Sequence, residues 1–153
     1  MPLTIERATP DDAEALVRVQ VAAFHDDARL YPGVPLGGPP GYESVAAMRL
    51  KIEQDECYKL DHDGQIVGGL AVYDKGEGHF HLDVLFVDPA YHGRGFGSQA
   101  MAYLLHAYPA TRWTLDTPTY ALRNQHFYEK FGYVRIGEED AGDIRLIAYE
   151  KRV

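Results

Sequence analysis

The stretch LDVLFVDPAYHGRGFGSQAMAYLL, residues 82–105, decides the fold that we expect for this chain. An apolar strand pattern leads into a proline and then into three alternate glycines, Gly93, Gly95 and Gly97, before a helical pattern begins. Glycines at such a junction let backbone N–H groups approach a ligand closely, because no Cβ intervenes. At the N-terminus of a helix those groups point at an anion, so the stretch predicts a site for a phosphate or pyrophosphate.

Composition and charge limit the classes of protein to consider. The 153 residues suit one core, and we expect residues 1–153 to form a single domain. The formal net charge of −8 argues against a nucleic-acid partner. No apolar run approaches the roughly 18 residues of a membrane span, and the first residues lack the pattern of an export signal. The single cysteine, Cys57, excludes an internal disulfide, so we expect a cytoplasmic protein.

Periodicity and turn residues predict a mixed α/β fold with the order β-α-α-β-β-β-α-β-α-β-β. Turns at Asp63-Gly64 and at residues 76–78 divide residues 57–88 into three strands, and residues 31–42 form a proline- and glycine-rich loop. The other expected strands are 3–7, 113–117, 133–139 and 144–151, and the expected helices are 8–24, 43–54, 98–108 and 123–132. This order implies a mixed sheet with helices on both faces.

The residues of the glycine stretch allow three interpretations to be weighed. The spacing Gly95-x-Gly97-x-x-Ala100, with Asp116 downstream, matches the dinucleotide pattern of nucleotide oxidoreductases. In that fold, however, the glycines follow the strand directly and more chain follows them, whereas here residues 89–92 intervene. A P-loop is excluded because no Gly-Lys-Ser/Thr follows. A glycine-rich turn without a ligand is the third reading, and His92 and Arg94 beside the glycines favour a phosphate.

Residues 82–105 resemble motif A of the GCN5-related N-acetyltransferases. That motif runs from a strand through V-x-P, here Val87-Asp88-Pro89, to Q/R-x-x-G-x-G/A, and His92 stands where the family has Gln or Arg. The segment FYEKFGY, residues 127–133, is similar to the family's later YEKxGF signature. The resemblance implies the acyl-CoA N-acyltransferase fold, in which the fourth and fifth strands splay apart.

The resemblance also implies that acetyl-CoA is the co-substrate and that an acceptor amine attacks it directly. In the family, the glycine stretch binds the pyrophosphate and the end of the fourth strand pairs with the pantetheine arm. The cofactor-binding residues expected here are Leu85, Phe86, Val87, His92, Gly93, Arg94, Gly95, Phe96, Gly97, Ser98 and Asn124. Asn124 is included because Ala121 stands where the family often has an asparagine. The alternative is a non-catalytic acyl-CoA sensor or regulatory module on the same fold.

Two residues are the candidates for proton transfer. The resemblance assigns Tyr128 as the acid that protonates the departing CoA thiolate. On the strand HFHLDVLFV, alternation places His79, His81 and Asp83 on one face, and Asp83 is our first candidate for the general base. His81 is the alternative base, and this face also fits a metal site or a solvated surface. We expect no metal.

The acceptor stays open at this stage. In the family, the first two helices and their loop shape the acceptor pocket, which corresponds here to residues 23–44. A small polyamine, an amino acid, an aminoglycoside and a protein N-terminus are all compatible with these residues. Members of the family often dimerise, so a homodimer is a further expectation.

Overall fold

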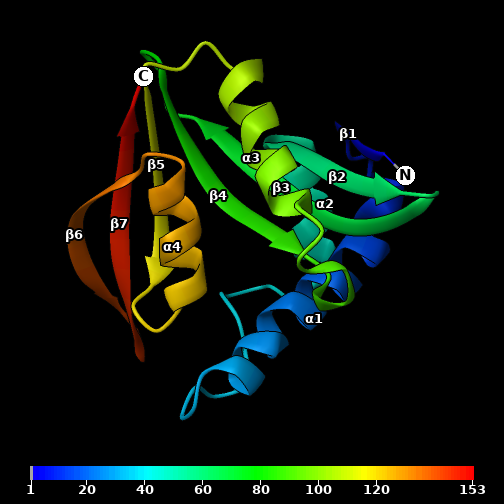
Figure 1. Cartoon of the computed structure of the whole chain (residues 1–153). Helices are drawn as coiled ribbons and strands as arrows, with labels where there is room; N and C mark the ends of the chain where they lie inside the picture. The colour runs from blue at the N-terminus through cyan, green and yellow to red at the C-terminus, as the bar shows by residue number, and fades with distance from the viewer. Residues whose placement is uncertain (1) are drawn as a thin grey trace. The chain divides into compact units, whose positions relative to one another are not determined.

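The computed structural model describes residues 2–153, whose strands form a sheet of order β1-β2-β3-β4-β5-β7-β6 (Figure 1). The strands are β1 (Leu3–Arg7), β2 (Glu56–His62), β3 (Gln65–Asp74), β4 (His79–Val87), β5 (Arg112–Pro118), β6 (Val134–Ala141) and β7 (Ile144–Arg152). The α-helices are α1 (Ala13–Leu30), α2 (Val45–Gln54), α3 (Phe96–Ala107) and α4 (Leu122–Lys130), with short 3-10 turns at Pro10–Asp12 and Pro89–Tyr91. The predicted element order and mixed α/β class are confirmed.

The chain divides into two compact units. The first runs to Val72 and resumes over Val84–Tyr108, and the second comprises Tyr73–Asp83 and Pro109–Val153. Strands β3 and β4 therefore contribute residues to both units. A single domain over residues 1–153 stays a prediction.

In the first unit, helices cover both faces of the strands. Cys57 lies in a buried apolar cluster with residues of α1 and α2, such as Leu16 and Ile52. Its neighbour Tyr58 points to the other face, where its ring meets Tyr103 of α3 edge-on at 5.6 Å. Figure 1 shows α3 in front of β2 and β3, with α2 behind them. The alternation along one strand thus separates two apolar layers, which agrees with the helices on both faces that the element order predicted.

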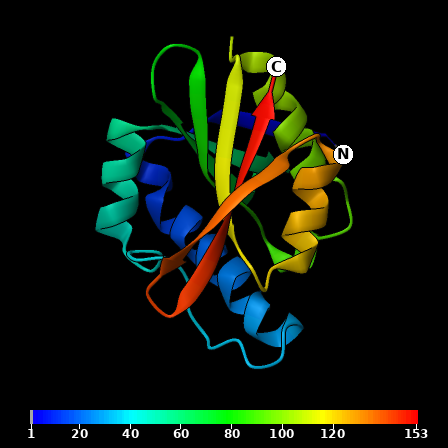
Figure 2. The same ribbon diagram turned by 90° about the vertical axis from the view of Figure 1, so that its left-hand side faces the viewer.

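In the second unit, β5 pairs antiparallel with β7, and β7 with β6, and α4 lies beside them (Figure 2). Trp113, Leu115 and Tyr149 are each at most 1% exposed and form the centre of this unit. Within the unit, β4 and β5 pair in parallel over their first three residues, from His79–Arg112 to His81–Thr114. Pairing limited to the start of both strands agrees with the splay expected of the fourth and fifth strands.

Several helix boundaries differ from those predicted, including the start of α1, which lies at Ala13, after the 3-10 turn, and not at residue 8. Helix α1 continues to Leu30, beyond the predicted end at residue 24, because no glycine or proline interrupts the chain before Pro32. Helix α3 begins at Phe96 rather than at Ser98. Its first turn therefore lies inside the glycine stretch, since Gly95 adopts a left-handed conformation and caps the helix. None of the helices described for residues 2–153 is long and apolar enough to span a bilayer.

Candidate active site

The glycine stretch between β4 and α3 adopts the backbone that its sequence predicted. Gly93 has φ +80° and Gly95 has φ +79°, in the left-handed region that side chains disfavour. A Cβ built on either residue would find no atom of the described chain within 4 Å. Glycine is therefore required here by conformation and not by packing, and the space beside it is open to a ligand.

The first turn of α3 adds hydrogen-bond donors beside these glycines. The hydrogen bond that closes the first turn runs from Gln99 N–H to the Gly95 carbonyl, at 3.0 Å. The N–H groups of Phe96, Gly97 and Ser98 precede it in the helix and have no intrahelical acceptor. Phe96 is only 5% exposed, and its ring packs against His62 and Tyr91, which anchors the first turn of α3. This arrangement fits a pyrophosphate in its charge and in its donors.

The side chains predicted to reach the outer phosphates make local contacts. His92 Nε2 lies 3.0 Å from the Val87 carbonyl and donates to it. The Arg94 guanidinium lies over the Tyr91 ring, 5.0 Å from its centroid, which is a cation–π contact. Both side chains are exposed at this surface. Their contact with phosphate stays a prediction.

The end of β4 is held close to β3 by two glycines that the sequence reasoning did not single out. A Cβ on Gly68 would lie 2.5 Å from the Phe86 carbonyl oxygen, and one on Gly69 would lie 2.7 Å from the Phe86 ring. Adjacent glycines inside a strand indicate such a close approach of another backbone. Phe86 is buried, whereas Leu85 and Val87 are half-buried, and the contact of these three residues with a ligand stays a prediction.

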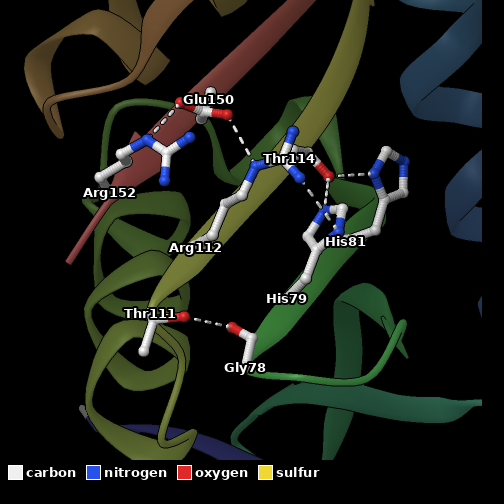
Figure 3. Close-up of polar contacts among 8 residues, drawn as sticks. All are labelled: Gly78, His79, His81, Thr111, Arg112, Thr114, Glu150 and Arg152. Carbon is white, nitrogen blue, oxygen red and sulfur yellow. Dashed lines mark hydrogen bonds and ion pairs between the residues drawn. The ribbon is translucent and has the colours of Figure 1, made fainter.

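The polar face predicted on β4 is present in the second unit (Figure 3). His79 Nε2 and His81 Nδ1 each lie 2.7 Å from the hydroxyl oxygen of Thr114 on β5. The two histidines therefore share a face, as alternation predicted. Thr114 was not anticipated, because its role depends on the β4–β5 register, which pairs it with His81. Asp83 follows on the same face, two residues after His81.

The surroundings of His81 favour its neutral form. Burial lowers the pKa of His81, and the positive charge of Lys75 adds to that effect, while Asp116 and Asp83 oppose it. His81 Nε2 lies 3.9 Å from the Asp116 carboxylate, and the ring of Tyr73 stacks on the imidazole at 6.3 Å. Across residues 2–153, no group of three or more His, Cys, Asp and Glu side chains is placed to hold a metal ion.

Helix α4 carries the predicted acid. Tyr128 is 8% exposed, and burial raises the pKa of its phenol to about 12. Its ring packs against the rings of Phe127, Tyr133 and Tyr149. Among the described residues its hydroxyl has no hydrogen-bond partner, so the O–H can donate to a ligand. Asn124 lies one turn earlier, and its Nδ2 is 3.5 Å from the Thr117 hydroxyl. The contact of Asn124 with the co-substrate stays a prediction.

Comparison with known proteins shows the family of the chain. The family model described as acetyltransferase (GNAT) domain matches residues 53–135, which is more than half of the chain. A curated relative, the S-(2-succino)cysteine N-acetyltransferase of Bacillus subtilis, is 26% identical over 98% of this chain and 93% of its own.

Solved structures show the same fold. The PaiA N-acetyltransferase of Thermoplasma acidophilum in complex with coenzyme A aligns over 100% of both chains, with a TM-score of 0.78 and 15% identity. A GCN5-related N-acetyltransferase of Rhodopseudomonas palustris aligns over 100% of this chain and 97% of its own, with a TM-score of 0.79 and 21% identity.

The glycine site is tested by comparing two glycines that have the same φ. Gly95 and Gly64 both have φ +79° and open space where a Cβ would stand, but Gly64 lies in the β2–β3 turn. Alanine at either position should destabilise the fold by about 1–2 kcal/mol through left-handed strain. Acetyl-CoA should raise the Tm of the wild type and of Gly64→Ala, and should leave the Tm of Gly95→Ala unchanged. Wild-type affinity of Gly95→Ala in calorimetry would refute the pyrophosphate assignment.

Proposed function

The chain belongs to the GNAT acetyltransferase family and transfers an acetyl group from acetyl-CoA to an amine; from this premise we propose which residues perform the transfer. The backbone of residues 93–98 holds the pyrophosphate, and the backbone of Leu85, Phe86 and Val87 pairs with the pantetheine arm. The observation that supports this proposal most is the open, left-handed backbone at Gly93 and Gly95, which a phosphate group fits.

Direct transfer needs three operations at the reacting atoms. The amine loses a proton before or as it attacks the acetyl carbonyl, the carbonyl oxygen accepts negative charge, and the CoA thiolate leaves with a proton. We propose that Asp83 accepts the amine proton and that Tyr128 donates the proton to the thiolate. A phenol with a pKa of about 12 is protonated across the neutral and mildly alkaline range and is therefore ready to donate.

The proposed acceptor is the α-amino group of a small amino acid, with S-substituted cysteines as the leading class. The support is the curated S-(2-succino)cysteine N-acetyltransferase, whose likeness extends over nearly the whole of both chains. Two further expectations from the sequence, a cytoplasmic location and a homodimer, stay predictions.

A thiol-release screen tests the acceptor. Acetyl-CoA is supplied with S-substituted cysteines, unsubstituted amino acids, polyamines, aminoglycosides and peptides with free N-termini. We expect the S-substituted cysteines to give the highest kcat/KM. A higher kcat/KM for a polyamine, an aminoglycoside or a peptide would contradict the acceptor class and leave the family assignment intact.

The base is tested by Asp83→Asn, which keeps the shape of the side chain and removes its basicity. We expect kcat/KM to fall by roughly 10²-fold, within the usual range for a general base, while acetyl-CoA affinity in calorimetry stays at the wild-type value. Asp143→Asn, in the exposed β6–β7 turn of the same unit, is the matched control and should keep the wild-type kcat/KM. Equal rates for Asp83→Asn and wild type would remove Asp83 from the mechanism.

The acid is tested by Tyr128→Phe, which removes the donor and keeps the ring contacts. Turnover should fall by roughly 10–10³-fold with acetyl-CoA binding preserved. Tyr149→Phe is the matched control, because its ring belongs to the same aromatic cluster and its hydroxyl donates to Glu129 at 2.7 Å. This control should lose stability, by about 1 kcal/mol, and keep its turnover. If both variants turn over equally, Tyr128 is a packing residue.

A further inference from the structure

A continuous chain of polar contacts in the second unit leads from the surface to His81 (Figure 3). In order, its members are Arg152, Glu150, Arg112, His79, Thr114 and His81. At its outer end, the Glu150 carboxylate accepts from Arg152 Nε at 3.0 Å and from Arg112 Nε at 2.6 Å. The two cations lower the pKa of Glu150, and the carboxylate in turn holds the Arg112 guanidinium in place.

Arg112 determines which group donates and which accepts in each hydrogen bond from Arg112 to His81. A guanidinium carries only donors, so His79 Nδ1, 3.4 Å from Arg112 Nη1, must be the acceptor. A neutral His79 then carries its proton on Nε2 and donates it to the Thr114 oxygen at 2.7 Å. The Thr114 hydroxyl has one proton, and it is left to donate to His81 Nδ1, also at 2.7 Å. His81 therefore carries its own proton on Nε2, which faces the Asp116 carboxylate at 3.9 Å.

We propose that Arg112, through His79 and Thr114, holds His81 as a neutral imidazole whose Nε2–H faces the Asp116 carboxylate. In this state Nδ1 accepts from the Thr114 hydroxyl and Nε2 carries the proton, so His81 has no free lone pair to take the amine proton. Arg112, His79 and Thr114 are thus positioning residues, and proton acceptance falls to a carboxylate. The inference rests on the proposed function only in that Asp83 is the carboxylate that accepts the proton.

The groups around His81 agree with a neutral donor. Protonation at Nδ1 would replace the bond from the Thr114 hydroxyl with a second donor aimed at the same oxygen. Burial also lowers the pKa of His81. The charged or titratable groups that act on it are Asp116 on β5, Asp83 and His79 on β4, and Lys75 in the β3–β4 turn, and the Tyr73 ring of β3 covers the imidazole. The two carboxylates favour protonation, so the hydroxyl bond and burial must outweigh them for the ring to stay neutral.

Nuclear magnetic resonance of the ring nitrogens tests the direction of the chain without any assay of activity. In the wild-type protein at neutral pH, we expect both His79 and His81 to carry their proton on Nε2, with assignments made from His79→Gln and His81→Gln. In Arg112→Met the donor to His79 is lost, and the Nδ1–H form of His79 should appear. A proton on Nδ1 of either histidine in the wild type would overturn the proposal, whatever the acceptor of the enzyme is.

Kinetics then test whether the hydrogen bonds from Arg112 to His81 contribute to the reaction. Thr114→Val removes the hydroxyl that donates to Nδ1, so the pKa of His81 should rise. A protonated His81 would place its charge beside Asp83 and weaken that carboxylate as a base, so the acid limb of kcat/KM should move to higher pH, with kcat/KM about tenfold lower at neutral pH. Thr114→Ser keeps the hydroxyl and should keep the wild-type profile. Thr111→Val is the matched control, because the Thr111 hydroxyl bonds the Gly78 carbonyl outside the chain. Identical profiles for Thr114→Val and Thr111→Val would overturn the positioning role even with the expected tautomers.

Discussion

The left-handed backbone of Gly93 and Gly95 is the constraint on which the proposed co-substrate site depends. Two residues with positive φ, separated by Arg94, turn the chain from the end of β4 into the first turn of α3. An L-residue would strain this turn and would also place a Cβ in the open space beside it. The same two glycines thus shape the backbone and leave open the space proposed for the phosphate. The strain of an L-residue or its added Cβ would each be enough to impair the proposed site.

A second close approach supports this turn from within the first unit. The pair Gly68 and Gly69 on β3 allows the Phe86 carbonyl and ring to lie where side chains would otherwise stand. The Asp88 N–H, directly after β4, donates to the Val67 carbonyl at 2.7 Å. Backbone contacts on both sides of Val87 therefore fix where the strand ends and where the glycine turn starts. Glycines act here in two ways, by conformation at the turn and by size in the strand.

Much of this arrangement could be predicted from the sequence, because local chemistry specifies it. The glycine turn, the turn at Asp63-Gly64 and the alternation of His79 and His81 follow from φ requirements and a period of two. The length of α1 was underestimated, although the sequence carries the stop signal, since Pro32 and Gly33 closely follow the end of the helix at Leu30. The partnership of Thr114 with two histidines could not be predicted, because it arises from the parallel register of β4 and β5, which short segments do not specify.

The polar face of β4 shows why residue type alone does not assign a catalytic role. A histidine on a strand face beside carboxylates is a reasonable base by its ordinary pKa. The direction of its hydrogen bonds argues against that role. A guanidinium can only donate, so each next side chain in the series must accept on one side and donate on the other. Arg112 is such a donor, and the Glu150 carboxylate keeps it in place at 2.6 Å. In the proposed arrangement, this series of hydrogen bonds sets the protonation state of His81, and the strand face combines an imidazole whose Nε2–H faces Asp116 with the carboxylate that is proposed as the base.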